Sequence, residues 1–213
     1  VQREMQTLDV MGVAALLKAA GGSELQSSIA VLVGTGLRRG ELLGLRWSDL
    51  DLSIGRLAVR RSVEMIDGKR QEKPPKTARS ARTLALASFV VEALRRQKGE
   101  QNERRLVLGL GRDENAYVSD RSDGTPWNPD SFSWSFAELI RRSKLPRIRL
   151  HDLRHSHATL ALSAGTDLKT ISAALGQSSI AARRIHTYML WRRCSAVMPT
   201  GSTQCSERRS RAP

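Results

Sequence analysis

Two basic side chains in the last third of the chain lie at a spacing that could hold a phosphate group. In the segment HDLRH, His151 and Arg154 are three residues apart and would share the first turn of one helix, where backbone N–H groups also favour an anion. A solvated helix start would explain the same pattern. The i, i+4 spacing of His151 and His155 would suit zinc, but no third ligand is evident, so we expect no metal site.

Cleaving a phosphodiester without a metal ion makes clear demands on the side chains. Arginine neutralises phosphate oxygens best, because its planar guanidinium pairs with two oxygens at once. A hydroxyl group must attack the phosphorus and retain the phosphate as a covalent ester. A general acid must protonate the departing sugar oxygen. Two arginines, a lysine, a histidine and a hydroxyl would therefore suffice.

The segment TGLRRGELLGLRW, residues 35–47, supplies another arginine in a defined setting. Gly36 allows a tight entry into a short helix, and Glu41 lies one turn after Arg38, where its carboxylate can support the guanidinium. An amphipathic helix with a solvated arginine pair is the alternative. The basic run KPPKTARS, residues 73–80, lies between two expected strands and is typical of an exposed loop that could also reach a nucleic-acid groove.

Four segments in this order resemble the catalytic domain of the tyrosine recombinases of the phage integrase type. They are TGLRRGELLGLRW, PKTARSARTLAL, PRIRLHDLRHSHATLALSAG and LGQSSIA. In that family two arginines, a histidine and a hairpin lysine surround the scissile phosphate of DNA. The resemblance implies that Glu41 positions the first arginine and that His155 gives structural support. The four phosphate-binding residues that it implies are Arg38, Lys76, His151 and Arg154.

The chain departs from the family pattern near its C-terminal end. Gln177 stands where the family usually has His or Trp; it can donate a hydrogen bond but carries no charge. Tyr188 is the candidate nucleophile, although its neighbours do not fit the pattern. We interpret residues 182–213 as an aberrant tail, disordered or read in a shifted frame. Codon degeneracy allows the other frame to encode ADTYIHAVAEVQRRDADRIDAV, which resembles the family's ending.

The composition agrees with a nucleic-acid partner. The 213 residues carry a net charge of +14, which is not confined to the tail, and a surface this basic usually meets a polyanion. A hydrophobic fraction of 40% with only 4% aromatic residues predicts a largely aliphatic core. No apolar run approaches the ~20 residues of a membrane span. Cys194 and Cys205 both lie in the tail, so we expect no disulfide framework and a cytoplasmic location.

The periodicity predicts a mainly helical α+β domain with a small three-stranded antiparallel sheet. Alternation predicts strands at 56–65 and 82–86, and Asp67-Gly68 predicts a hairpin turn. Helices are expected near residues 10–17, 24–33, 38–45, 88–98, 131–142, 151–164 and 167–175. We expect residues 1–181 to form the catalytic domain, without the N-terminal DNA-clamping domain that the family carries.

The resemblance implies a site-specific DNA recombinase or integrase that cleaves and rejoins strands through a 3′-phosphotyrosine. It implies action on double-stranded DNA as a tetramer on paired sites, with no cofactor. Gln177 and the tail leave open a second interpretation, a catalytically impaired DNA-binding remnant. A basic RNA-binding protein would account for the charge. It would not account for the ordered segments, and the chain lacks the aromatic stacking surface of such proteins.

Overall fold

The computed structural model describes residues 6–74 and 81–176. The helices of this part are α1 (Val10–Ala19), α2 (Gln26–Thr35), α3 (Arg39–Leu43), α4 (Ser88–Val107), α5 (Pro129–Arg142), α6 (Asp152–Ser163) and α7 (Leu168–Leu175), with a 3-10 turn η1 (Trp47–Asp49). Its strands are β1 (Leu50–Asp51), β2 (Arg56–Val59), β3 (Ser62–Ile66), β4 (Lys69–Lys73) and β5 (Arg82–Ala85). The predicted α+β class, mainly helical with a small antiparallel sheet, is confirmed.

Helix α2 is the centre of the fold. Its sequence, QSSIAVLVGT, is apolar or small all round, which is typical of a helix buried on every side. It packs against α1, α3, α4 and α6. Its polar side chains are satisfied internally: Ser28 Oγ lies 2.7 Å from Ser119 Oγ, and Thr35 Oγ1 donates to the Val31 carbonyl at 2.6 Å. The helix can therefore lie in the core without unpaired hydroxyl groups.

The three-stranded sheet has the order β1-β2-β5, with Leu57 opposite both Leu50 and Leu84. The expectation of one strand over residues 56–65 is wrong, because the chain leaves this sheet after β2. The break falls at Arg60 and Arg61, whose side chains both turn toward the buried Asp49, with N–O distances of 3.7 and 2.5 Å. Satisfying this buried carboxylate takes precedence over continuing the strand.

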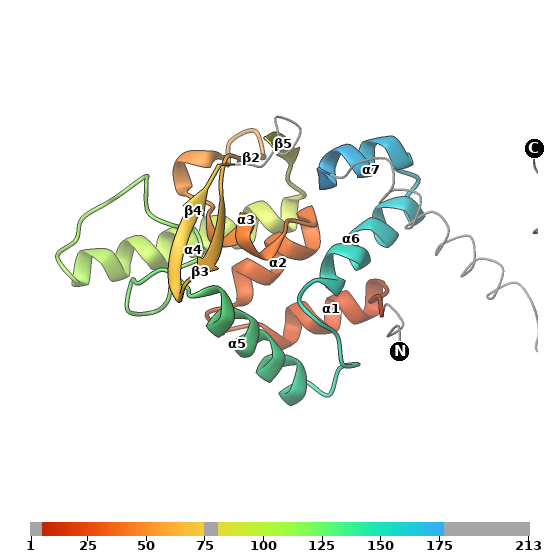
Figure 1. The fold of residues 1–213 in the computed structure, drawn as a ribbon, viewed down its shortest axis with the longest axis horizontal. Coiled ribbons are helices and arrows are strands. Elements are labelled where there is room, and N and C mark those ends of the chain that lie inside the picture. Colours follow the sequence, from red (N-terminus) through yellow and green to blue (C-terminus); the bar gives the residue numbers. More distant parts are fainter. Residues whose placement is uncertain (1–5, 75–80, 177–213) are drawn as a thin grey trace, which may run out of the picture.

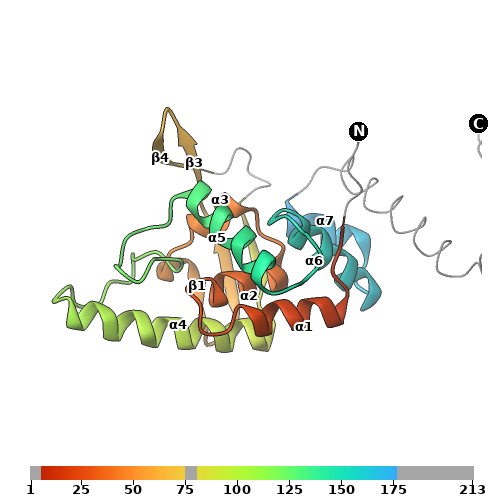
Figure 2. The same cartoon turned by 90° about the horizontal axis from the view of Figure 1, so that it is seen from below.

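Strands β3 and β4 form a separate hairpin that projects from the body of the molecule (Figure 2). Its turn is Asp67-Gly68, and both residues have positive φ, 49° and 73°, as the predicted two-residue hairpin turn requires. The hairpin is tied to the core through Tyr117. The Arg70 guanidinium lies 4.3 Å from the centre of the Tyr117 ring, and the Tyr117 hydroxyl donates to Glu72.

Helix α4 is longer than predicted and, with α1, runs along the side of the molecule opposite the hairpin (Figure 2). The prediction ended it at Lys98 before Gly99, but the helix continues to Val107. Gln101 explains the extension: it is buried, accepts a hydrogen bond from the Trp47 indole and donates to the Tyr117 carbonyl at 2.9 Å. These contacts outweigh the low helix propensity of one glycine.

Helix α5 lies below the core in Figure 1, and α6 and α7 close the fold at its right-hand side. In α5, Asn128 caps the first turn, Pro129 starts the helix, and Phe132, Phe136 and Ile140 form its buried stripe. In α7, Ile171 and Leu175 are buried one turn apart. Within residues 6–74 and 81–176, no helix has both the length and the apolarity to cross a bilayer.

Candidate active site

Arg38 and Glu41 form a local unit at the start of α3. Arg38 is the residue before the helix, and its backbone N–H donates to Glu41 Oε2 at 2.9 Å. Its Nη1 donates to Glu41 Oε1, also at 2.9 Å. Burial alone would raise the pKa of Glu41, but hydrogen bonds and charge from Arg82 and Arg38 hold it below its ordinary value. Glu41 is therefore an anion that fixes one end of the Arg38 side chain.

Arg154 enters the same place from α6 and is buried, with 2% of its surface exposed. Its Nη1 donates to the Gly36 carbonyl at 2.7 Å, its Nη2 donates to the Leu175 carbonyl, and its Nε has no partner among the described residues. Burial, and then the charge of Arg38, lower the pKa of Arg154 to about 9. The guanidinium stays charged at neutral pH, but it lies in surroundings that favour the arrival of an anion.

Three arginines meet the end of α7 at three consecutive carbonyl groups. Arg82 Nε donates to Ala174, Arg154 Nη2 to Leu175, and Arg38 Nη2 to Gly176 at 3.2 Å. The arginines come from β5, α6 and the start of α3, so the end of α7 is where these elements join. The unpaired carbonyls at a helix C-terminus carry partial negative charge, which attracts the three cations.

Two glycines make these approaches possible. Gly36 has φ +64°, and a Cβ there would lie 2.6 Å from Leu175 Cδ2 and 2.8 Å from His157 Cδ2. Gly176 has φ +59°, and a Cβ there would lie 3.1 Å from Arg82 Nη1. At both positions any other residue would strain the backbone and crowd the site.

His151 precedes α6 and lies close enough to Arg154 and Arg38 for their charges to act on it. Partial desolvation, and then the charge of Arg154, hold the pKa of His151 below its ordinary value. His155 packs edge-on against it, with ring centres 5.1 Å apart and an angle of 84° between the planes. Burial, and then the His151 charge, lower the pKa of His155 as well. Both rings are therefore mainly neutral at pH 7, and His151 can accept a proton.

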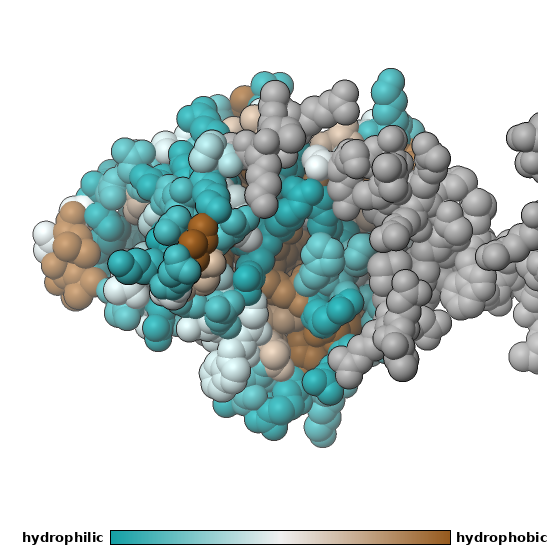
Figure 3. All heavy atoms as spheres, viewed as in Figure 1, coloured by the Kyte–Doolittle hydropathy of each residue, from teal (hydrophilic) through white to brown (hydrophobic). Residues whose placement is uncertain are grey.

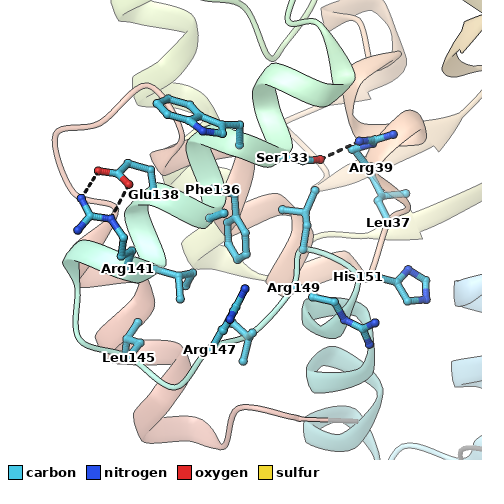
Figure 4. Close-up of a pocket in the computed structure, with 15 residues that line it drawn as sticks. Leu37, Arg39, Ser133, Phe136, Glu138, Arg141, Leu145, Arg147, Arg149 and His151 are labelled. Atoms are coloured by element: carbon cyan, nitrogen blue, oxygen red, sulfur yellow. Dashed lines mark hydrogen bonds and ion pairs between the residues drawn. The ribbon is translucent and has the colours of Figure 1, made fainter. Parts of the chain in front are cut away.

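A groove of about 1020 Å³ begins beside His151 and runs between α5 and residues 145–150 (Figure 4). Its floor is apolar, and its edges are basic. Arg39 lies at one edge, donating to Ser133 Oγ at 2.7 Å, and Arg149 lies near His151. On the face shown in Figure 3, mostly hydrophilic residues surround this apolar hollow. The apolar floor is formed by Leu37, Phe136, Ala137, Ile140, Leu145, Ile148 and Leu150.

The structure brings part of the predicted site together from distant segments. Arg38 and Arg154 reach adjacent carbonyl groups although 116 residues separate them in the chain (154 − 38). The remaining predicted residues, Lys76, Gln177 and Tyr188, lie outside the described residues. In the part of the chain that the structure describes, no group of three or more His, Cys, Asp or Glu side chains could hold a metal ion.

Comparison with known families decides the identity of this domain. The model of the phage integrase family matches residues 6–189. The chain belongs to the phage integrase family. The match extends past Ala181 and includes Tyr188, while the interpretation of residues 182–213 as an aberrant tail stays a prediction.

Relatives within the phage integrase family are recombinases and integrases of bacteria and their phages. The chain is 30% identical over 203 residues to a "Tyrosine recombinase XerC-like" protein of Caldanaerobacter subterraneus subsp. tengcongensis, covering 89% of this chain and 52% of that one. It is 36% identical over 146 residues to the "ICEBs1 integrase" of Bacillus subtilis, covering 68% and 39%. The chain thus spans about half the length, or less, of these relatives.

Solved structures of a transposon integrase and of a recombinase share the fold. The Tn1549 transposon integrase in complex with transposon right end DNA gives a TM-score of 0.75 at 21% identity, covering 92% of this chain and 67% of that one. The XerA recombinase gives 0.66 at 23% identity, covering 94% and 66%. These likenesses confirm the predicted architecture.

Sequence reasoning missed Arg82, which belongs to the candidate site. It was predicted only as the start of a strand. Its side chain is 7% exposed and makes two hydrogen bonds of 3.0 Å to Glu41. A signal was available: Arg82 and Leu84 are two apart in β5, and Leu84 is buried, so alternation places Arg82 on the inward face.

Proposed function

We propose that this chain is the catalytic domain of a site-specific DNA recombinase that cleaves and rejoins strands through a 3′-phosphotyrosine. One observation carries the proposal above all. Arg154 is buried without an ion-pair partner among the described residues, beside a second arginine that a carboxylate holds in place. Two guanidinium groups so arranged suit a phosphate, whose charge would repay the cost of burying them.

The proposed reaction conserves the energy of the phosphodiester. The Tyr188 hydroxyl oxygen attacks phosphorus, the bond from phosphorus to the 5′-oxygen breaks, and a 3′-phosphotyrosine forms. The tyrosine proton passes toward the neutral His151 ring, while Lys76 protonates the leaving 5′-oxygen. A 5′-hydroxyl of a partner strand then attacks the phosphotyrosine, restoring a DNA phosphodiester and free tyrosine.

Arg38 and Arg154 would stabilise the charge that develops on the five-coordinate phosphorus, and Gln177 would add a neutral hydrogen bond. Glu41 would hold Arg38, and His155 would support His151. The chain's own residues thus supply phosphate binding, the acid and the nucleophile. That the reaction needs no cofactor stays a prediction.

Double-stranded DNA is the proposed substrate and partner. The basic edge of the groove beside His151, with Arg39 and Arg149, offers further phosphate contacts. A tetramer on paired sites is the proposed working assembly, by analogy with the lambda integrase, which has been solved as a tetramer on a Holliday junction. Action on cellular DNA would place the protein in the cytoplasm, which stays a prediction.

The test is recovery of a covalent protein–DNA adduct. The chain is incubated in EDTA with a pool of nicked duplexes that carry randomised sites, so that the cleaved fragment diffuses away and the adduct accumulates. Adducts are isolated under denaturing conditions and their DNA is sequenced. We expect adducts with the wild type and none with Tyr188→Phe. An adduct that requires a divalent cation, or that persists in Tyr188→Phe, would contradict the mechanism.

A catalytically impaired DNA-binding remnant is the second candidate. The observation that favours it is Gln177, which cannot carry the charge of a histidine at that position. The same assay separates the two functions. A remnant would bind duplex DNA and give no adduct, whereas Gln177→His would restore adduct formation if this position alone limits the reaction.

A further inference from the structure

Arg82 makes more contacts in the candidate site than a strand residue needs for its own burial. Its Nη1 and Nη2 donate to Glu41 Oε1 and Oε2, both at 3.0 Å, and its Nε donates to the Ala174 carbonyl. The side chains of Arg82 and Glu41 are only 7% and 5% exposed. One guanidinium thus joins β5, α3 and the end of α7.

Each oxygen of the Glu41 carboxylate accepts two hydrogen bonds. Oε1 accepts from Arg38 Nη1 at 2.9 Å and from Arg82 Nη1 at 3.0 Å. Oε2 accepts from the Arg38 backbone N–H at 2.9 Å and from Arg82 Nη2 at 3.0 Å. A carboxylate held by two donors on each oxygen has little rotational freedom. The Arg38 side chain is 43% exposed, and the Glu41 carboxylate orients its guanidinium. Arg82 in turn orients the Glu41 carboxylate.

We propose that Arg82 is a positioning residue for strand transfer. It acts on Arg38 in two ways: it holds Glu41, which binds Arg38, and its bond to the Ala174 carbonyl fixes the end of α7, to which Arg38 also donates. This inference rests on the proposed function. It adds to the proposed site a residue that acts through the orientation of its neighbours.

The charge balance argues against a purely structural ion pair. Arg38 alone would neutralise Glu41, so the addition of Arg82 leaves the described group of Arg38, Arg82, Arg154 and Glu41 positive. Buried ion pairs contribute little stability compared with apolar side chains of similar size. An excess of buried positive charge is typical of a site that binds an anion. Arg82 is placed to keep Glu41, and through it Arg38, in position when an anion binds.

The experiment compares Arg82→Ala and Arg82→Lys with a matched control, Arg104→Ala. Arg104 also pairs with a buried carboxylate, Asp120, at 2.9 Å, but it lies on α4 away from the site. For each protein we measure urea stability, affinity for duplex DNA, and the single-turnover rate of adduct formation. We expect both Arg82 variants to lower the rate about 100-fold, the loss typical of a misplaced transition-state donor, with DNA affinity changed less than about threefold. Arg104→Ala should lose stability and keep its rate.

A double-mutant cycle with Arg38→Ala separates positioning from general structural damage. If Arg82 acts through Arg38, adding Arg82→Lys to Arg38→Ala changes the rate less than about threefold, because the effect has already been lost. Losses that multiply in the double variant would overturn the proposal. So would a rate in Arg82→Lys equal to that of the wild type.

If the wild type forms no adduct, the proposed recombination reaction is refuted, but the positioning role of Arg82 can still be tested by phosphate binding. Inorganic phosphate should raise the melting temperature of the wild type and of Arg104→Ala, since it binds the folded state. It should leave the melting temperatures of the folded Arg82→Lys and Arg38→Ala proteins nearly unchanged. An equal phosphate response in the wild type and Arg82→Lys would refute the positioning role.

Discussion

Replacing Arg154 by methionine removes a buried charge while keeping a flexible side chain in the same space. In the folded protein, burial and the charge of Arg38 lower the pKa of Arg154 far below its ordinary value, to about 9. Each tenfold change in an ionisation constant is worth about 1.4 kcal/mol, so the fold disfavours the charged form by about 5 kcal/mol. Methionine does not carry this cost.

The substitution also removes two hydrogen bonds. The carbonyl groups of Gly36 and Leu175 would lose their donor, and an unsatisfied buried acceptor costs about 1–3 kcal/mol. Leaving both carbonyl groups unsatisfied lowers the free energy of unfolding by about 2–6 kcal/mol. Removing the buried charge raises it by about 5 kcal/mol. We expect the free energy of unfolding of Arg154→Met to lie between about 3 kcal/mol above and 1 kcal/mol below the wild type.

Urea unfolding and the adduct assay together test this balance. The control is Arg61→Met, because Arg61 pairs at 2.5 Å with Asp49, whose side chain is 1% exposed. Removing that partner leaves the buried carboxylate with only the longer Arg60 ion pair, at 3.7 Å, and should cost about 3 kcal/mol. Arg154→Met should keep its stability and lose adduct formation. If it unfolds as readily as Arg61→Met, or still forms adducts, Arg154 is a structural residue and the reasoning fails.

Four further predictions follow from other parts of the molecule. Duplex affinity, measured by fluorescence anisotropy, should fall steeply and linearly on a log–log plot against salt; a flat profile would exclude a phosphate-dominated interface. Gly176→Ala should cost about 1–2 kcal/mol in urea, because of its positive φ and the contact with Arg82, and unchanged stability would show that the end of α7 can relax. Tyr117→Phe should cost about 1 kcal/mol by removing the hydrogen bond to Glu72, whereas a much larger loss would mean that the hydroxyl holds more than the hairpin. The coding sequence beyond Ala181 should encode the family's ending in its other frame, and a chain carrying that ending should form adducts faster; a frame without it would remove the hypothesis.

Local patterns predicted the elements whose causes lie within a few residues. The stripe of Phe132, Phe136 and Ile140 has the helical period, and α5 follows it. Asp67-Gly68 provides two residues that tolerate positive φ, and the turn forms there. In each case the side chains that decide the structure are neighbours in sequence, so periodicity and turn chemistry suffice.

Elements decided by distant partners were not predictable in the same way. The strand over residues 56–65 divides because Arg61 turns toward Asp49, and the gap that Arg61 leaves in the apolar alternation was the only local sign. Helix α4 passes Gly99 because Gln101 binds Trp47 and the Tyr117 carbonyl. No pattern within the helix reveals partners that lie elsewhere in the chain.

The candidate site shows the same division. Resemblance placed Arg38, Glu41 and Arg154, whereas the ordering of that group depends on Arg82 and on the last carbonyls of α7. Three arginines donate to the carbonyls of Ala174, Leu175 and Gly176. A movement of this helix end would therefore reorient the arginine side chains, and a movement of the arginines would shift the helix end. A phosphate that draws Arg38 or Arg154 toward itself competes with these carbonyls for the same N–H donors. Binding of DNA and the position of the end of α7 should therefore be coupled, and substitutions at the end of α7 should affect phosphate binding as directly as substitutions of the arginines.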